Sequence, residues 1–391
     1  LYPTAEALSM LQTIFAGPLE SAILTGHAAA VIASSYAPDD SLLLTASMDK
    51  TARIWNRSGQ CVAVLSGHTD AVLDAAWSPD AQYILTASSD KTARVWTQKG
   101  SVIAMLVGHL GPVLGGAFSP DGESILTYSS DHTARLWSSK GDSLNLLRGH
   151  EDALTSAHFS RSGERILTTS KDRTARVWSR HGLLVQVLRG HAAAVSCGSI
   201  HPSGQQFATV SWDHSARLWS ESGTCTAVLS GHTDRVNFGE FSPDGKLIVT
   251  ASRDHTARLW DDQGKPLGVL RGHDKGVQGA RFSLDGNRIV TFSSDHTARL
   301  WERDGKPLCV LRAHEQGVQS GSFTASSNDF DLATTSWDGT TRVWSGSGSC
   351  SLILRDHQGP LTQCALSPNG QLLLTAAQDN TVYLWRVNGQ R

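Results

Sequence analysis

The nonapeptide SSDHTARLW occurs twice without change, at Ser129–Trp137 and at Ser293–Trp301. Similar stretches recur along the chain, and each ends in a tryptophan that lies 28 residues after a histidine, or 30 residues after it in the eighth case. The first eight of these histidines are 41 residues apart, and the last step is 43 residues. They are His27, His68, His109, His150, His191, His232, His273, His314 and His357. This spacing indicates nine copies of one structural unit.

One unit contains four short apolar segments. In residues 229–270, which read LSGHTDRVNFGEFSPDGKLIVTASRDHTARLWDDQGKPLGVL, the segments are VNFGEF, KLIVTAS, TARLW and PLGVL. Ser-Pro-Asp-Gly, a turn centred on an aspartate, and Gln-Gly separate them, and all three are combinations that favour tight turns. Four strands in about 40 to 45 residues, with a Gly-His pair and a tryptophan, are typical of one blade of a β-propeller.

On these residues the chain resembles the WD-repeat (WD40) β-propeller family from about Leu19 to Trp385. The aspartate that usually follows the tryptophan in this family is kept only at Trp260-Asp261. The resemblance implies that a histidine, threonine, aspartate and tryptophan of each unit form one buried hydrogen-bonded network, as at His109, Thr127, Asp131 and Trp137. Nine copies of such a set indicate architecture, because a catalytic centre is a unique arrangement.

The resemblance also predicts how the ring closes. In this family the tryptophan ends the third strand and an outer fourth strand follows, but only RVNGQR follows Trp385. Residues 19–25 read as an outer strand with no blade before it, so we expect them to complete the ninth blade and remove two open sheet edges. The expected fold is all-β, a single closed propeller of nine four-stranded blades over residues 19–391. A seven-bladed ring with two loosely attached repeats is the alternative.

Residues 1–18 do not fit the repeat. Thr4 can cap a helix through AEALSMLQTIF that ends at Gly17-Pro18. The chain starts at Leu1 without a methionine, so we expect this N-terminal helix to be a linker from a longer polypeptide.

Composition excludes several classes of protein. Lys and Arg number 34 and Asp and Glu 36, so the net charge of −2 argues against general binding of nucleic acid or membrane. No apolar run is long enough to span a bilayer and there is no signal peptide, which predicts a cytoplasmic protein. Six widely spaced cysteines form no zinc or disulfide pattern.

The sequence predicts neither an enzyme nor a cofactor. It contains no phosphate-binding GxxxxGK[ST] loop, no HExxH and no GxSxG. Four histidines directly follow the turn aspartate, but equivalent positions on separate blades are too far apart for one metal ion. They are His132, His214, His255 and His296.

An arginine lies two residues before eight of the nine tryptophans. We expect its stem between blades and its head at a carboxylate or carbonyl, and a phosphate-binding ring is the alternative. These arginines are Arg53, Arg94, Arg135, Arg176, Arg217, Arg258, Arg299 and Arg342.

Candidate binding residues lie where the repeats differ. By the family resemblance, the residue before the turn aspartate lies on the top rim, and it varies from serine to tryptophan and long cations. Tryptophan and arginine are favoured anchors of protein interfaces. The predicted partner-binding residues are Met48, Lys171, Trp212, Arg253, Trp337 and Gln378, with Asp74, Arg235 and Phe238 near the start of the inner strands.

We therefore expect a non-catalytic scaffold or sensor propeller whose top face binds a protein or peptide. The uniform repeats and the segment TAEALSMLQTIF before the first strand resemble the C-terminal propellers of bacterial signalling ATPases of the STAND class. That resemblance implies a partner in an N-terminal NTPase and effector region of the same chain. A propeller that binds nucleic acid or a phosphate ligand is the alternative.

Overall fold

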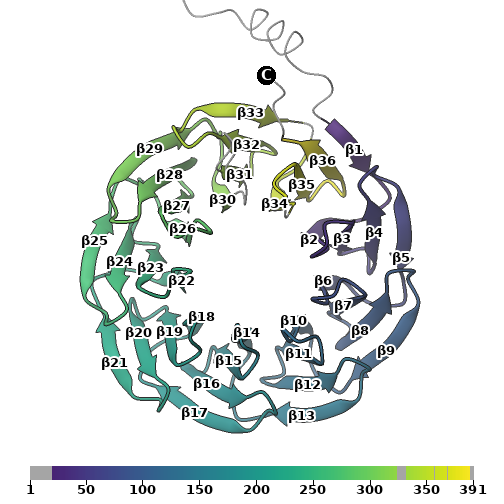
Figure 1. The fold of residues 1–391 in the computed structure, drawn as a ribbon, viewed down its shortest axis with the longest axis horizontal. Coiled ribbons are helices and arrows are strands. Elements are labelled where there is room, and N and C mark those ends of the chain that lie inside the picture. Colours follow the sequence, from purple (N-terminus) through teal and green to yellow (C-terminus); the bar gives the residue numbers. More distant parts are fainter. Residues whose placement is uncertain (1–19, 324–331, 356, 368, 388–391) are drawn as a thin grey trace, which may run out of the picture.

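The computed structural model describes residues 20–323, 332–355, 357–367 and 369–387. The described residues form 36 strands in nine four-stranded sheets, which surround a central channel (Figure 1). The prediction of nine blades is confirmed. The predicted helix in residues 1–18 lies outside the described residues.

The first five blades each run outward from the channel in chain order. Blade 1 consists of β2 (Val31–Tyr36), β3 (Leu42–Ser47), β4 (Ala52–Asn56) and β5 (Cys61–Leu65). Blade 2 consists of β6 (Val72–Trp77), β7 (Tyr83–Ser88), β8 (Thr92–Thr97) and β9 (Val102–Val107). Blade 3 consists of β10 (Val113–Phe118), β11 (Ser124–Ser129), β12 (Ala134–Ser138) and β13 (Ser143–Leu147). Blade 4 consists of β14 (Leu154–Phe159), β15 (Arg165–Ser170), β16 (Thr174–Ser179) and β17 (Leu184–Arg189). Blade 5 consists of β18 (Val195–Ile200), β19 (Gln206–Ser211), β20 (Ala216–Ser220) and β21 (Cys225–Leu229).

The last four blades follow the same order, except that the ninth combines both ends of the chain. Blade 6 consists of β22 (Val236–Phe241), β23 (Leu247–Ser252), β24 (Ala257–Asp261) and β25 (Pro266–Leu270). Blade 7 consists of β26 (Val277–Phe282), β27 (Arg288–Ser293), β28 (Thr297–Glu302) and β29 (Pro307–Arg312). Blade 8 consists of β30 (Val318–Phe323), β31 (Leu332–Ser336), β32 (Thr341–Trp344) and β33 (Cys350–Leu354). Blade 9 consists of β34 (Leu361–Leu366), β35 (Leu372–Ala377), β36 (Val382–Arg386) and β1 (Glu20–Leu24).

Ring closure occurs in blade 9. Strand β1 pairs antiparallel with β36, with Ala22 opposite Leu384 and Leu24 opposite Val382. Leu24 is fully buried and packs with Trp55 of blade 1 and Leu374 of blade 9. The predicted role of the N-terminal strand is confirmed, and its pairing leaves no break in the ring (Figure 1).

The turns are fixed by short-range hydrogen bonds that the repeated residues supply. In blade 6 the Ser242 hydroxyl donates to the Asp244 carboxylate at 2.7 Å and accepts from the backbone N–H of Leu247 at 3.0 Å. Gly245 closes this turn with a φ of +77°, a conformation that favours glycine. The chain therefore reverses at the same place in repeat after repeat.

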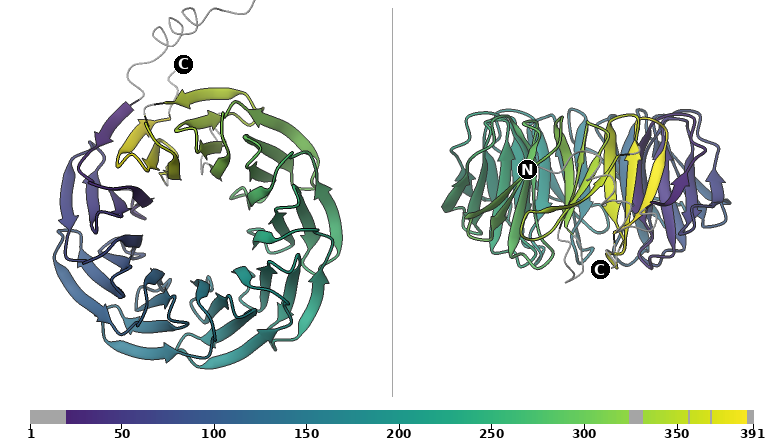
Figure 2. Two further views of the ribbon diagram at one scale, coloured as in Figure 1. Left: turned by 180° about the vertical axis from the view of Figure 1, so that it is seen from behind. Right: turned by 90° about the horizontal axis from the view of Figure 1, so that it is seen from above.

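The hydrophobic core lies between consecutive blades. Between blades 6 and 7, Val249 and Leu259 pack against Ile289 and Trp301. Figure 2 shows that the blades stand side by side around the ring, so the molecule is a disc with two faces. The top face carries the loops that contain the nine histidines and the turns between second and third strands. The bottom face carries the Ser-Pro-Asp-Gly turns and the turns between third and fourth strands.

Candidate protein-binding face

A four-residue hydrogen-bonded network supports the top face in all nine blades. In blade 5 the indole Nε1 of Trp219 donates to the Thr209 hydroxyl at 2.8 Å, and Thr209 lies 2.8 Å from Nε2 of His191. Nδ1 of His191 then donates to the Asp213 carboxylate at 2.8 Å. The other eight blades repeat this chain of contacts, which confirms the structural role expected for these residues.

The aspartate of each network ties two loops of the top face together. In blade 6, Asp254 accepts from Nδ1 of His232 at 2.7 Å and from the backbone N–H of Thr233 at 3.0 Å. Its other oxygen accepts from the backbone and the hydroxyl of Thr256 at 2.9 and 2.7 Å. The residue just before the aspartate is consequently held at the apex of a rigid turn.

In the networks of blades 1 to 3 the pKa values of both the aspartate and the histidine are lowered. Burial opposes ionisation of Asp49, yet hydrogen bonds from Thr51, the backbone of Ala28 and His27 lower its pKa to about 2. Burial lowers the pKa of His27, although Asp49 acts in the opposite direction. The same directions hold for the histidine and aspartate of blades 2 and 3.

The arginine side chains of the ring contact backbone carbonyl groups. In blade 6, Nη2 of Arg258 donates to the carbonyl oxygen of Gly231 at 2.7 Å. A Cβ atom on Gly231 would lie only 2.4 Å from Nη1 of Arg258, so the glycine leaves room for the guanidinium. In blade 8 the same position is Ala313, and its carbonyl oxygen still accepts from Nη2 of Arg342 at 2.7 Å. Arg217 differs, because its Nη1 lies 3.8 Å from Sγ of Cys225. These contacts support the structural role of the arginines over a phosphate-binding ring.

Six of the predicted binding residues occupy equivalent turns of the top face, and all six are exposed. They are Met48, Lys171, Trp212, Arg253, Trp337 and Gln378. The exposed fraction of Trp212 is 37% and that of Trp337 is 43%, which is unusual for the largest apolar side chain.

Three predicted residues form one cluster, which we call the Trp212 cluster: Trp212, Arg235 and Arg253. The guanidinium carbon of Arg235 lies 4.6 Å from the centre of the Trp212 ring, a cation–π contact between blades 5 and 6. The backbone N–H of Arg253 donates to the carbonyl oxygen of Arg235 at 3.0 Å. The Trp212 ring and the Arg235 guanidinium are thus in contact on the rim, and the turn that carries Arg253 is bonded to the same loop as Arg235.

Trp337 belongs to blade 8, three blades beyond the blade that carries Trp212. Its backbone N–H donates to the carbonyl oxygen of Gly317 at 3.0 Å. A Cβ atom on Gly317 would lie 3.2 Å from the Trp337 ring and 3.4 Å from Cα of Ser294 in blade 7. The ring therefore lies against this loop, and the absence of a side chain at Gly317 makes room for it.

Two predicted residues lie on the innermost strands instead of the rim. Asp74 accepts from the backbone N–H of Gly116 in the next blade at 3.2 Å, and burial raises its pKa. Phe238 lies beneath Arg281 of the next blade, whose guanidinium carbon is 5.3 Å from the Phe238 ring centre. Neither side chain contacts the Trp212 cluster through any interaction recorded for the described residues.

One exposed residue of the top face, Leu110, is not among the binding residues predicted from the sequence. Leu110 follows the histidine of blade 3 and is 81% exposed. The other repeats have Ala, Thr, Glu, Asp or Gln at this position, so comparison of the nine copies would have revealed it.

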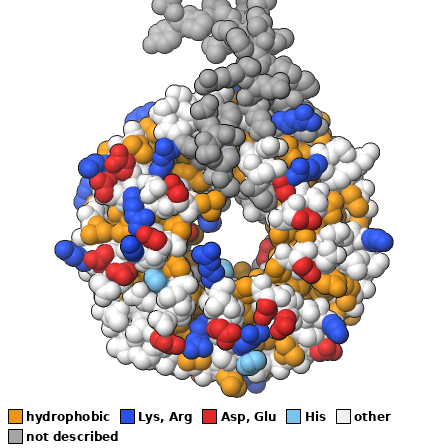
Figure 3. Space-filling view, viewed as in Figure 1, with side chains coloured by type: hydrophobic (Ala, Val, Ile, Leu, Met, Phe, Trp, Pro, Cys, Tyr) orange, Lys and Arg blue, Asp and Glu red, His pale blue; other side chains and the backbone are white. Residues whose placement is uncertain are grey.

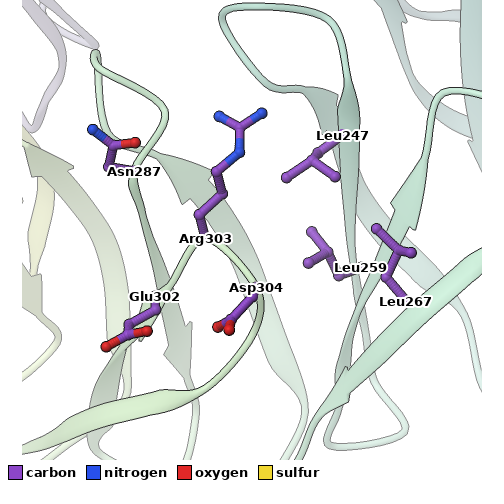
Figure 4. Close-up of a pocket in the computed structure, with 7 residues that line it drawn as sticks. All are labelled: Leu247, Leu259, Leu267, Asn287, Glu302, Arg303 and Asp304. Carbon is purple, nitrogen blue, oxygen red and sulfur yellow. The ribbon is translucent and has the colours of Figure 1, made fainter.

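A cavity of about 580 Å³ lies on the bottom face between blades 6 and 7 (Figure 4). Leu247, Leu259 and Leu267 form one wall, and Arg303 and Asp304 stand opposite. Gly268 explains the empty space. Its counterparts Ala63, Ala104 and Ala227 contact the turn glycine of the following blade, whereas a Cβ atom on Gly268 would meet nothing within 4 Å.

The described part of the chain holds no group of three or more His, Cys, Asp or Glu side chains placed to bind a metal ion. It also holds no helix of the length and hydropathy that a membrane crossing requires.

Comparisons with known proteins agree with this geometry. A family model described as the IFT122 first beta-propeller matches residues 112–386, and one described as the WD domain, G-beta repeat matches residues 19–56 and 59–97. The crystal structure of the computationally designed protein Ika8 is similar with a TM-score of 0.67 and 22% identity, and the match covers 94% of this chain and 100% of that one. The C-terminal WD40 domain of Sif2 matches with a TM-score of 0.67 and 19% identity, over 81% of this chain and 96% of that one. At these identities the likeness shows the fold alone. No match was found among curated proteins.

Proposed function

Since the chain belongs to the WD40 β-propellers, in the family described as the IFT122 first beta-propeller, we propose that it is a non-catalytic module whose top face binds another protein. Propellers of this kind are typically protein-interaction scaffolds. The Trp212 cluster carries the proposal, because it places an exposed tryptophan between blades and stacks an arginine upon it.

The chemistry of the cluster favours an acidic or aromatic segment of the partner. Tryptophan and arginine are enriched among the residues that contribute most to binding energy, since tryptophan offers a large rigid surface and arginine a planar cation that can stack and donate several hydrogen bonds. Arg235 and Arg253 form no ion pair within the described residues, so their charges are available to a partner's carboxylates.

We further propose that the propeller is the sensor of a larger cytoplasmic bacterial signalling protein and acts on an NTPase and effector region of the same chain. The uniformity of the nine repeats supports this setting. A regulatory domain that acts by binding other parts of the protein needs a rigid surface rather than a catalytic cleft.

A direct test is capture of partners by the immobilised propeller. Trp212→Ala combined with Trp337→Ala should weaken capture at least tenfold, because two anchors of the interface are removed. The control is Val62→Ala, which truncates an exposed apolar side chain near the end of β5 that is farther from the top face. Equal capture by both variants and the unaltered chain would overturn the proposal.

Nucleic acid is the second candidate, favoured by the exposed cations Lys171, Arg235 and Arg253. If it is the ligand, binding of a single-stranded RNA should fall steeply between about 50 and 200 mM salt and be lost in Lys171→Ala with Arg253→Ala. The 34 Lys and Arg residues are balanced by 36 Asp and Glu, so the chain has no general attraction to nucleic acid. Binding of protein is therefore the preferred candidate.

A further inference from the structure

The repeats also differ from one another near the bottom mouth of the channel. Eight residues after each histidine, the innermost strand carries a small residue in six blades and His158, Glu240 or Arg281 in the other three. The proline of the Ser-Pro-Asp-Gly turn is replaced by Arg161 in blade 4 and by Leu284 in blade 7, and blade 8 has the longer stretch FTASSNDFD at this place. Blades 4 and 7 thus differ from the other repeats at both sequence positions.

Four of these departures line one cavity. This cavity has a volume of about 370 Å³ and is lined by Arg161, Glu240, Arg281 and Leu284. Aromatic and apolar residues of blades 5, 6 and 7 complete the lining. Those apolar neighbours are Ile200, Pro202, Phe241, Pro243 and Phe282. The sequence differences and the cavity are independent observations, and both occur at the same place. Their coincidence indicates that these four side chains form one site. Figure 3 shows Lys and Arg side chains reaching the channel edge beside β18–β26.

The charged groups of the cavity are only partly satisfied by one another. Oε1 of Glu240 accepts from the backbone N–H of Phe282 at 2.9 Å, and Oε2 lies 3.9 Å from Nη1 of Arg281. The Arg281 side chain is 51% exposed and is held over the Phe238 ring. Arg161 forms no ion pair within the described residues. Two guanidinium groups against one carboxylate leave the cavity with an excess of positive charge.

We propose that this cavity, which we call the channel-mouth site, binds a small molecule that carries an oxyanion on an apolar body. Arg281 and Arg161 bind the oxyanion, because a guanidinium presents a fork of N–H donors that matches a carboxylate or phosphate. Phe241, Phe282 and Leu284 contact the apolar body. The volume is within the roughly 300 to 1,000 Å³ of small-molecule sites. The site lies on the face opposite the Trp212 cluster and is independent of the proposed protein binding.

The site can be tested by calorimetric titration of the chain with three probes. Phenyl phosphate carries both chemical features, inorganic phosphate only the oxyanion, and benzyl alcohol only the apolar body. Phenyl phosphate should bind more tightly than either of the others. Arg281→Gln should weaken its binding about tenfold or more, since a charge-assisted hydrogen bond is lost. Arg161→Pro, which restores the residue of the other turns, should weaken it in the same direction.

Lys246→Gln is the matched control, because Lys246 is an exposed cation of a neighbouring bottom turn that does not line the cavity. It should bind phenyl phosphate like the unaltered chain. Circular dichroism and urea midpoints establish that each variant is folded. Equal affinity for phenyl phosphate and inorganic phosphate, or full affinity in both arginine variants, would overturn the proposal.

Discussion

The indole of Trp219 and the hydroxyl of Thr209 form a 2.8 Å hydrogen bond in a region where both side chains are buried. The same hydroxyl also contacts His191, so it serves two polar groups that water does not reach. The ring is therefore held by polar networks as well as by apolar packing, and the top face has a fixed geometry.

Removing this hydroxyl should destabilise the ring. Thr209→Val leaves the Trp219 N–H and Nε2 of His191 without a partner, at a cost of about 1–3 kcal/mol in the free energy of unfolding. Thr127→Val should cost about the same, since its network is equivalent. Urea denaturation measures both, with the exposed Thr69→Val as the control. An unchanged midpoint for Thr209→Val would contradict the role given to these networks.

A second prediction concerns the closure of the ring by β1. Leu24→Ala should lower the free energy of unfolding by about 2–5 kcal/mol, because Leu24 is buried between blades 9 and 1. Ile23→Ala, its exposed neighbour on β1, should change it by no more than about 0.5 kcal/mol. Similar effects of the two substitutions would show that β1 does not complete blade 9 in solution.

Gly268→Ala should stabilise the protein by about 0.5–1 kcal/mol. A strand glycine costs conformational entropy, and here the added methyl group enters empty space next to the Leu259 wall. Gly116→Ala should have the opposite effect, because its Cβ atom would lie 2.7 Å from the carbonyl oxygen of Leu126. Thermal unfolding of both variants checks the sign of each change.

Stability should fall in two stages as the solution is acidified. Folding lowers the pKa of His27, His68 and His109 below the ordinary 6.5, so the unfolded chain binds more protons and stability decreases as pH falls below about 6.5. Asp49 and Asp90 have pKa values of about 2 against an ordinary 3.8, so their contribution is present above about pH 4 and is lost between about pH 4 and 2. Urea midpoints from pH 8 to 2 measure this. A midpoint that rises between pH 7 and 5 would contradict it.

Much of the fold could be predicted from the sequence because the unit is repeated. Nine copies of the same spacing reveal the strands, and the outer strand missing after Trp385 predicts the pairing of β1 with β36. The rim position of Trp212 and Arg253 also follows from the repeat. The contact between Arg235 and Trp212 could not be predicted, because it depends on side-chain conformations in two loops that are distant in the sequence.

The inner-strand candidates show a different limit of sequence reasoning. A β-bulge lies between Val72 and Asp74 and again between Val236 and Phe238. A bulge inserts one extra residue, so simple alternation no longer predicts which way the following side chains point. Asp74 is consequently placed against the next blade rather than on the rim, and its predicted contact with a partner stays a prediction.

Photo-crosslinking tests the proposed protein-binding face most directly. A benzophenone side chain at position 233, in the exposed loop beside Arg235, is compared with one at position 183, an exposed turn of the bottom face. If the top face binds a protein, position 233 gives a discrete crosslinked product that disappears with Trp212→Ala, and position 183 gives none. The same product from position 183, or a product at position 233 that survives Trp212→Ala, would contradict binding through the Trp212 cluster.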